Sequence, residues 1–282
     1  MIRVHILGSA AGGGLPQWNC ACANCLAART GKIAARTQSS IAVSAESKNS
    51  QNWWLINASP DLLRQIENTP QLQPLHKPLR NTRIAGVFLT NADIDHALGL
   101  LLLREEDKPL VVYAADKTQT ALEWLTGVLA RFYGIEWQKI SSDFQPLDEA
   151  LSFRAIELPH SVAFQFSDGP SGKTALFAPT VGELTEQLRD AVMTSDVVLV
   201  DGTFWSDDEL AKIRPGARSS RQMNHLPISN GSLDFLRQSG QRRKIYTHIN
   251  NTNPILTPGS QERAQVEQAG IEIAHDGMEI IL

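Results

Sequence analysis

The sequence predicts a layered α/β (α+β) fold. Short apolar runs rich in Val and Ile recur along the 282 residues and are bounded by Gly, Asn, Asp or Pro, which is typical of strands. Between them lie segments whose apolar residues repeat every three or four positions behind a capping residue, which is typical of amphipathic helices. No repeat or compositional break divides the chain, so we expect a single domain spanning residues 1–282.

The predicted elements alternate along the chain. The strands are Arg3–Leu7, Ser40–Ala45, Trp53–Asn57, Ile84–Leu89, Leu110–Ala114, Ala175–Phe177, Val197–Val200, Lys244–Thr247 and Ile271–Ala274. The helices run from Ser59 to Ile66, from Ala97 to Leu103, from Asp116 to Gly134, after a capping box of Thr180 and Glu183, and from Ser260 to Gly270. Many short strands with interspersed helices predict sheets covered by helices.

Charge and composition exclude several classes of protein. The chain has 26 Lys and Arg against 30 Asp and Glu without a block of like charge, so nucleic acid is not expected as a partner. No apolar run reaches the roughly 18 residues of a membrane span. The N-terminus lacks the pattern of a signal peptide, so we expect a cytoplasmic protein. An odd number of cysteines, all within six residues, cannot form a disulfide framework.

The strongest local signal is the group formed by Cys20, Cys22 and Cys25. Three thiols at C-x-C-x-x-C spacing on a turn can converge on one tetrahedral metal ion. Thiolates select zinc or an iron–sulfur cluster, but a four-cysteine cluster needs a cysteine that the chain lacks. We therefore predict structural zinc with a distant fourth ligand. The alternative is three thiols without a metal.

A second signal follows the predicted strand Ile84–Leu89. The stretch 90–96, TNADIDH, places Asp93, Asp95 and His96 between a strand end and a helix start, where the sites of α/β proteins usually lie. The alternative is a helix cap, but a cap needs one Asp only. Two carboxylates and an imidazole within four residues predict metal binding.

Further candidate ligands follow other strands. Asp201 and His248 each come directly after a predicted strand, so we expect them to share one site with the TNADIDH stretch. Taken alone, each of them is more often a turn or core residue. His225 and His160 are additional candidates, and for both the alternative is a structural histidine.

The stretch 8–14, GSAAGGG, follows the first strand but does not predict a nucleotide loop. It matches neither the P-loop nor the dinucleotide-binding pattern, and Pro16 and the cysteines follow it instead of a helix. Its glycines are expected to let the backbone pass close to a neighbouring loop or ligand.

Together these stretches resemble the pyrroloquinoline quinone biosynthesis protein B family. The matching segments run from end to end: GSAAGGGLPQWNCACANC (8–25), RTQSSIAVSA (36–45), LINASPDLLRQI (55–66), LTNADIDHALGLLLLRE (89–105), DGTFWSDDEL (201–210), MNHLPIS (223–229), THINNTNPIL (247–256) and AHDGMEIIL (274–282). The resemblance implies a metallo-β-lactamase fold, an αββα sandwich of two mixed sheets flanked by helices, with a metal site at one sheet edge.

The resemblance also implies a ligand set. The superfamily pattern H-x-H-x-D-H falls on Asn91, Asp93, Asp95 and His96, so the two histidines that usually hold a first metal are replaced. Asp95, His96 and His248 would hold the remaining ion, and two imidazoles with one carboxylate form the facial triad of non-haem iron(II) oxygenases. Asp93 and Asn91 would orient waters or substrate.

Other roles follow from the same resemblance. Asp201 and His225 look like the carboxylate–histidine pair of nuclease relatives, and we expect Asp201 to hold the tautomer of a His225 that moves a phenolic proton. Asn250 and Asn251 are expected to contact substrate. Asn251 also stands where a phosphodiesterase branch takes its fourth zinc ligand. The turn 178–180 lacks the bridging aspartate of dinuclear relatives, which counts against a two-metal site.

The function that the resemblance implies is a step in the biosynthesis of a quinone cofactor. Iron(II) and O₂ would hydroxylate the tyrosine ring of a small peptide of glutamate and tyrosine, with structural zinc at the cysteines. The expected partners are this peptide or a quinone precursor, O₂ and other cofactor-biosynthesis proteins, and a homodimer stays open. The alternatives are a metal-dependent hydrolase of phosphodiesters or esters and a carrier that binds the quinone for transport.

Overall fold

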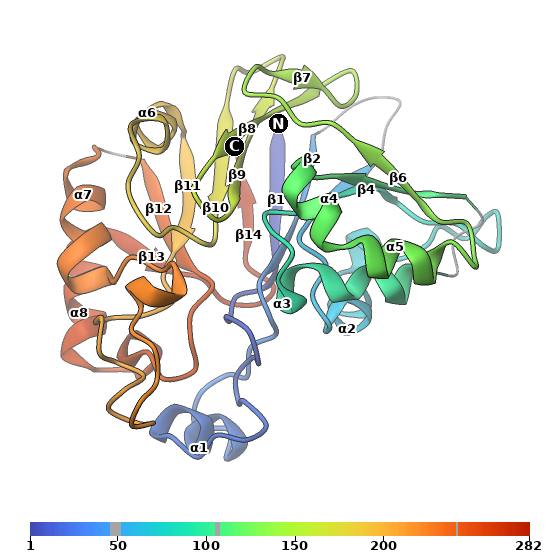
Figure 1. Cartoon of the computed structure of the whole chain (residues 1–282). Coiled ribbons are helices and arrows are strands. Elements are labelled where there is room, and N and C mark those ends of the chain that lie inside the picture. Colours follow the sequence, from blue (N-terminus) through green and yellow to red (C-terminus); the bar gives the residue numbers. More distant parts are fainter. Residues whose placement is uncertain (46–51, 105–107, 241) are drawn as a thin grey trace.

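The computed structural model describes residues 1–45, 52–104, 108–240 and 242–282. Within these ranges, two seven-stranded mixed sheets lie face to face and helices cover both outer faces, which confirms the predicted αββα sandwich (Figure 1). Glu105, the last residue of one of the matching sequence segments, lies outside the described residues. None of the helices within these ranges is long and apolar enough to cross a membrane.

The first sheet contains most of the N-terminal half of the chain and the last strand. Its order is β14 (Glu279–Ile281), β1 (Ile2–Gly8), β2 (Ser40–Ala45), β3 (Trp53–Ile56), β4 (Ile84–Phe88), β5 (Leu110–Tyr113) and β6 (Ile135–Gln138). The pairs from β14 to β3 are antiparallel, and those from β3 to β6 are parallel. The last strand therefore pairs with the first.

The second sheet contains the C-terminal half. Its order is β13 (Ile271–Ile273), β12 (Arg243–Thr247), β11 (Val197–Asp201), β10 (Thr174–Ala178), β9 (Val162–Asp168), β8 (Leu151–Glu157) and β7 (Gln145–Pro146). β10 to β13 are parallel neighbours, so their carboxyl ends lie at one edge of the sheet. β7, β8 and β9 continue the sheet with antiparallel pairs.

The helices divide between the two outer faces (Figure 1). The first sheet carries α2 (Leu62–Glu67), α3 (Ile94–Ala97), α4 (Asp116–Ala121), α5 (Glu123–Leu129) and the 3₁₀ helix η2 (Leu98–Leu103). The second carries α6 (Glu186–Thr194), α7 (Leu233–Gln238) and α8 (Gln261–Gln268). Short helical turns are η1 (Pro70–Leu72), η3 (Arg221–Met223), η4 (Ile228–Ser232) and η5 (Pro254–Leu256). Helix α1 (Ala23–Arg29) lies below both sheets.

Three apolar clusters stabilise these layers. Between the sheets, Phe88 of β4 packs edge-to-face against Phe153, Phe164 and Phe166 of the opposite sheet, with ring centroids 4.8–5.4 Å apart. A second cluster lies under α6, α7 and α8, and a third under α2, α4 and α5. Each sheet is therefore buried on both faces, which explains why its parallel strands read as continuous apolar runs.

Several predicted helix boundaries were wrong. Thr180 does not cap a helix; Thr185 caps α6 instead, and its Oγ1 accepts a hydrogen bond from the backbone N–H of Leu188 at 3.2 Å. The helix predicted over 116–134 is divided into α4 and α5 because the backbone at Leu122 leaves helical angles. Cys25 lies on α1 and not on a turn. Helix α2 begins at Leu62, three residues after the predicted start.

Candidate metal centre

Polar residues that follow strands of both sheets meet at one edge of the sandwich. Asp95 and His96 lie on α3 directly after β4, and His248 follows β12 of the opposite sheet. Oδ2 of Asp95 is 3.3 Å from Nε2 of His248 and 3.6 Å from Nε2 of His96. The structure thus brings together the three residues predicted to hold one ion, with a carboxylate oxygen and two ring nitrogens facing a common point.

Polar groups lie behind both histidines, at their Nδ1 atoms. Oδ1 of Asn91 lies 2.6 Å from Nδ1 of His96, and Oγ1 of Thr203 lies 2.8 Å from Nδ1 of His248. In the tautomer in which Nδ1–H donates to these groups, each Nε2 would offer its lone pair to an ion, the arrangement that neighbouring groups impose on metal-binding histidines.

The donor set fits a cation. Nε2 of His96 is buried and has no hydrogen-bond partner among the described residues, which is costly unless an ion binds there. Burial lowers the pKa of His96 to about 4, so its ring is neutral near pH 7, as a metal ligand must be. Burial opposes ionisation of Asp95, but His96 and His248 outweigh it and lower the pKa of Asp95.

Asp201 and His225 form a buried pair beside His248. Oδ2 of Asp201 lies 2.7 Å from Nδ1 of His225 and accepts the backbone N–H of Val181 at 2.8 Å. Burial acts against both charges, yet the pair raises the pKa of His225 and lowers the pKa of Asp201. The His225 ring stacks on that of His248, with centroids 5.3 Å apart. The ligand atoms of Asp201, His225 and His248 also lie within 4.8 Å of one another, so this pair adjoins the predicted ligands; its proton-transfer role stays a prediction.

Thr203 is a residue of this site that the sequence did not reveal. Its Oγ1 lies 2.6 Å from Oδ1 of Asp201, 2.8 Å from Nδ1 of His248 and 3.1 Å from Nδ1 of His225. The one available signal was its position two residues after Asp201, at the exit of β11. One hydroxyl thus holds the carboxylate and both imidazoles in register.

Asn91 and Asp93 lie beside the predicted ligands. The amide Nδ2 of Asn91 donates to Oδ2 of Asp93 at 2.6 Å, while its Oδ1 faces His96. The side chain of Asn91 is therefore occupied by its two neighbours. Asp93 is exposed at the rim of the site. A direct contact of Asn91 or Asp93 with substrate stays a prediction.

The glycine-rich turn after β1 passes directly over Asp95. A Cβ at Gly12 would lie 3.2 Å from Oδ2 of Asp95, and the N–H of Ala11 donates to the carbonyl of Ile249 at 3.0 Å. The close backbone approach predicted for this stretch is thus observed at Gly12.

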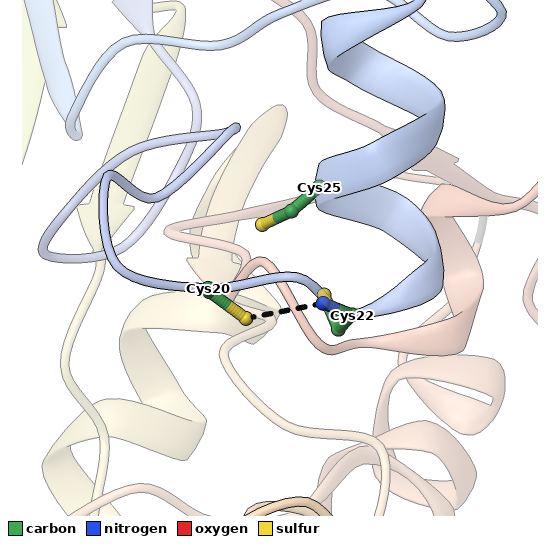
Figure 2. Close-up of side chains that lie close together, drawn as sticks. All are labelled: Cys20, Cys22 and Cys25. Atoms are coloured by element: carbon green, nitrogen blue, oxygen red, sulfur yellow. Dashed lines mark hydrogen bonds between the residues drawn. The ribbon is translucent and has the colours of Figure 1, made fainter.

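The cysteine group lies beside α1. Figure 2 shows the three side chains turned toward one another, Cys20 and Cys22 from the loop and Cys25 from the first turn of the helix. Their sulfur atoms all lie within 4.8 Å of one another. Burial raises the pKa of Cys25 to about 11; burial opposes ionisation of Cys20 too, but the N–H of Cys22 helps to lower its pKa. Three converging sulfurs fit one thiophilic cation.

Asn251 lies at the cysteine group, a placement that differs from the substrate contact expected for it. Its side-chain nitrogen is 3.2 Å from the sulfurs of Cys20 and Cys25 and 3.5 Å from that of Cys22. Nδ2 of Asn24 donates to the carbonyl of Asn251 at 3.0 Å, which fastens the cysteine loop to the chain that follows His248.

Two other candidates lie apart from the predicted ligands. His160 is exposed and joins no group of converging ligand atoms in the described part of the chain. The side chain of Asn250 donates to Oγ1 of Thr252 at 2.5 Å, and its backbone N–H donates to the carbonyl of Thr203. A role of Asn250 in substrate binding stays a prediction.

Known proteins are similar to this chain over its whole length. Residues 52–249 match the model of a beta-lactamase superfamily domain. The coenzyme PQQ synthesis protein B of Cupriavidus taiwanensis is 41% identical to the chain, and that of Azoarcus sp. is 39% identical, with 100% of each chain covered. The chain belongs to the coenzyme PQQ synthesis protein B (PqqB) family. This confirms the resemblance in the sequence segments.

Solved structures agree with PqqB membership. The crystal structure of Zn²⁺-bound PqqB from Methylobacterium extorquens matches with a TM-score of 0.89 at 37% identity, covering 99% of this chain and 100% of that one. A diphosphatase of the PhnP family matches with a TM-score of 0.72 at 18% identity, a likeness of fold alone.

Proposed function

We propose that this PqqB family member takes part in the biosynthesis of pyrroloquinoline quinone by oxidising a tyrosine ring. The proposed substrate is a small peptide of glutamate and tyrosine. Family membership supports the pathway. The observation that carries the reaction is the convergence of Asp95, His96 and His248, one carboxylate and two imidazoles, which is the donor set of non-haem iron(II) oxygenases.

The residues around these ligands suit such a reaction. Asp95, His96 and His248 would hold a ferrous ion, which would supply activation of O₂. The Nε2 of His225 is proposed to take the phenolic proton, because Asp201 holds the other ring nitrogen as a donor. One phenol ring and one O₂ give an ortho-quinone and one water, so the electrons balance without an added reductant. Asp93 and Asn91 are proposed to orient substrate or water at the rim.

The cysteine group is proposed to hold structural zinc. The Zn²⁺ named for the Methylobacterium extorquens PqqB and the three converging sulfurs support this assignment. A 180° flip of the Asn251 amide exchanges its nitrogen and oxygen, which would present a carbonyl oxygen to the same point as a fourth ligand. Zinc there would fix the loop that follows His248.

The test is O₂ uptake by protein loaded with ferrous iron without air, with glutamyl-tyrosine as substrate. We expect uptake with formation of a ring-oxidised product identified by mass spectrometry. Asp95→Ala should lose iron and activity. The matched control is Asp208→Ala, since Asp208 is an exposed carboxylate paired with Lys212 away from the site.

Other outcomes would reassign the function. Cleavage of a phosphodiester without O₂ consumption would favour the hydrolase, and tight binding of the quinone without either reaction would favour the carrier. Localisation in the cytoplasm and a homodimer are part of the same proposal, and gel filtration of the purified chain tests the latter.

A further inference from the structure

A polar pocket adjoins the Asp201–His225 pair. It has a volume of about 170 Å³, several times the roughly 30 Å³ that a water molecule occupies in the liquid. Its walls include His160, Thr180, Glu183, Arg221 and Asn224. An anion-binding guanidinium, a cation-binding carboxylate and an imidazole thus line one hollow.

The polar groups of this pocket are largely without partners. Oγ1 of Thr180 is buried and has no hydrogen-bond partner among the described residues. Within the same ranges, the side chains of Glu183 and His160 form no hydrogen bond or ion pair. The guanidinium of Arg221 makes one long hydrogen bond, 3.4 Å, to the carbonyl of Asn230. These groups remain available to a ligand that carries both charges.

The walls of the pocket continue into the site. Thr180 precedes Val181, whose N–H donates to Asp201, and Asn224 precedes His225. The N–H of Leu226 donates to the carbonyl of Val181 at 2.6 Å, which joins the two loops.

The wall at His160 also leads back to the predicted ligands. Two residues further on, the N–H of Val162 donates to the carbonyl of Thr90 at 2.7 Å, and Thr90 contacts His96. Hydrogen bonds thus join a wall of this pocket to the segment that positions His96.

We propose that this pocket binds the charged groups of an amino-acid or short-peptide substrate, with a carboxylate at Arg221 and an ammonium at Glu183. The Oγ1 of Thr180 and the ring of His160 would donate further hydrogen bonds to the carboxylate. The inference rests on the proposed function, because it supplies the anchor for the peptide whose tyrosine ring reaches the metal ligands. With this anchor, the protein would select substrates by the free charged termini of the peptide as well as by its tyrosine ring.

The test is calorimetric binding of glutamyl-tyrosine to the full chain without air, compared with the N-acetylated and the C-amidated dipeptide. Each cap should weaken binding roughly 1.4- to 5-fold, the range of an exposed charge pair. Arg221→Gln should remove the difference between the free and amidated peptides. Glu183→Gln should remove the difference between the free and acetylated peptides. Binding of glutaminyl-tyrosine, which lacks the side-chain carboxylate but keeps the C-terminal one, shows which of the two carboxylates Arg221 binds.

Matched controls carry the same charge changes outside the pocket. Arg218→Gln and Glu186→Gln alter exposed residues of the flanking segments and should preserve both differences. Thr180→Val should weaken binding but leave the melting temperature unchanged or higher, since it removes a hydroxyl that has no partner in the unliganded protein. If Thr180 had a merely structural role, the substitution would lower both the peptide affinity and the melting temperature.

The result that overturns the proposal is equal binding of free and capped peptides, or no binding of any. The proposal is also overturned if Arg221→Gln and Glu183→Gln change peptide binding no more than the controls Arg218→Gln and Glu186→Gln do. Preserved discrimination between free and capped peptides without O₂ uptake would refute the oxygenase but keep the pocket. O₂ uptake with equal use of free and capped peptides would support the oxygenase and refute the peptide-binding role of the pocket.

Discussion

His248 has a backbone conformation that is unusual for a residue with a side chain. Its φ is 55°, in the left-handed region, and Thr203 donates to its carbonyl and contacts its ring. Such conformations persist where surrounding contacts enforce them, often at functional sites. Here the enforced turn aims Nε2 at Asp95.

Thr203→Val should therefore weaken metal binding at Asp95, His96 and His248. Loss of the hydroxyl frees the carboxylate and both rings from one another, and removal of such supporting contacts typically costs about 10- to 100-fold in metal affinity. Competition with a chromophoric chelator measures the change. Thr194→Val, on the exposed end of α6, is the control. Equal affinities would refute the supporting role of Thr203.

A second prediction concerns His225. His225→Gln should lower turnover of glutamyl-tyrosine by about 10²- to 10⁴-fold, the usual contribution of a positioned proton acceptor. The metal content should stay that of the unmodified protein if Asp95, His96 and His248 hold the ion; the ligand atoms of Asp201, His225 and His248 also lie within 4.8 Å of one another, so metal analysis decides between the two groups. Metal analysis beside the activity assay checks both. Loss of iron would instead assign His225 as a ligand.

At the scale of elements, η2 depends on the absence of a side chain. A Cβ at Gly99 would lie 2.3 Å from the carbonyl oxygen of Ser59 and 2.7 Å from that of Ala58, and backbone atoms cannot move aside cheaply. Gly99→Ala should lower the free energy of unfolding by about 1–3 kcal/mol, as overpacking of a core does.

The control is another glycine. Gly127→Ala places its methyl group in open space on the exposed face of α5, so it should stabilise the chain by roughly 0.5–1 kcal/mol. Urea unfolding of both variants measures the contrast. Destabilisation by both changes to the same extent would contradict the account.

Elements with apolar runs could be predicted from the sequence, and those stabilised by distant polar partners could not. The parallel strands are buried on both faces and read as Val-rich runs. The strand β9 was missed because Gln165 interrupts it. In the fold its side chain contacts Arg154 at 2.6 Å and Ser195 at 2.8 Å, neither of which is near it in sequence.

At the metal centre, too, residues whose partners are distant in the sequence could not be predicted. Asp95, His96 and His248 are ligand types that follow strands, so a shared site could be predicted from the sequence. That the two strands belong to opposite sheets, which the fold brings face to face, could not be read from it. Thr203 and Asn24 are ordinary polar residues whose partners are brought to them by the fold. Their roles could not be read from local sequence.

At the scale of the whole molecule, one buried carboxyl links stability to pH. Burial raises the pKa of Glu209 to about 7, although Thr252 and the N–H of Trp205 donate to it. Between about pH 4.5 and 7 the folded chain keeps this proton and the unfolded chain has lost it. The free energy of unfolding therefore falls as pH rises through this window.

Glu209→Gln should remove this contribution. The variant's free energy of unfolding, relative to that of the unmodified chain, should rise between pH 5 and pH 8 by at most about 3 kcal/mol. Urea unfolding at several pH values measures it, with the exposed Glu67→Gln as control. A difference independent of pH would show that the carboxyl does not titrate in this window.

The predicted ligands come from opposite sheets, Asp95 and His96 from one and His248 from the other. An ion held by all three would cross-link the halves of the sandwich at their shared margin. Thermal motion that separates the two sheets would then also move His248 away from Asp95 and His96 and weaken ion binding. Heating should therefore release the ion before the chain unfolds. Thermal inactivation would begin as demetallation, which added iron could reverse.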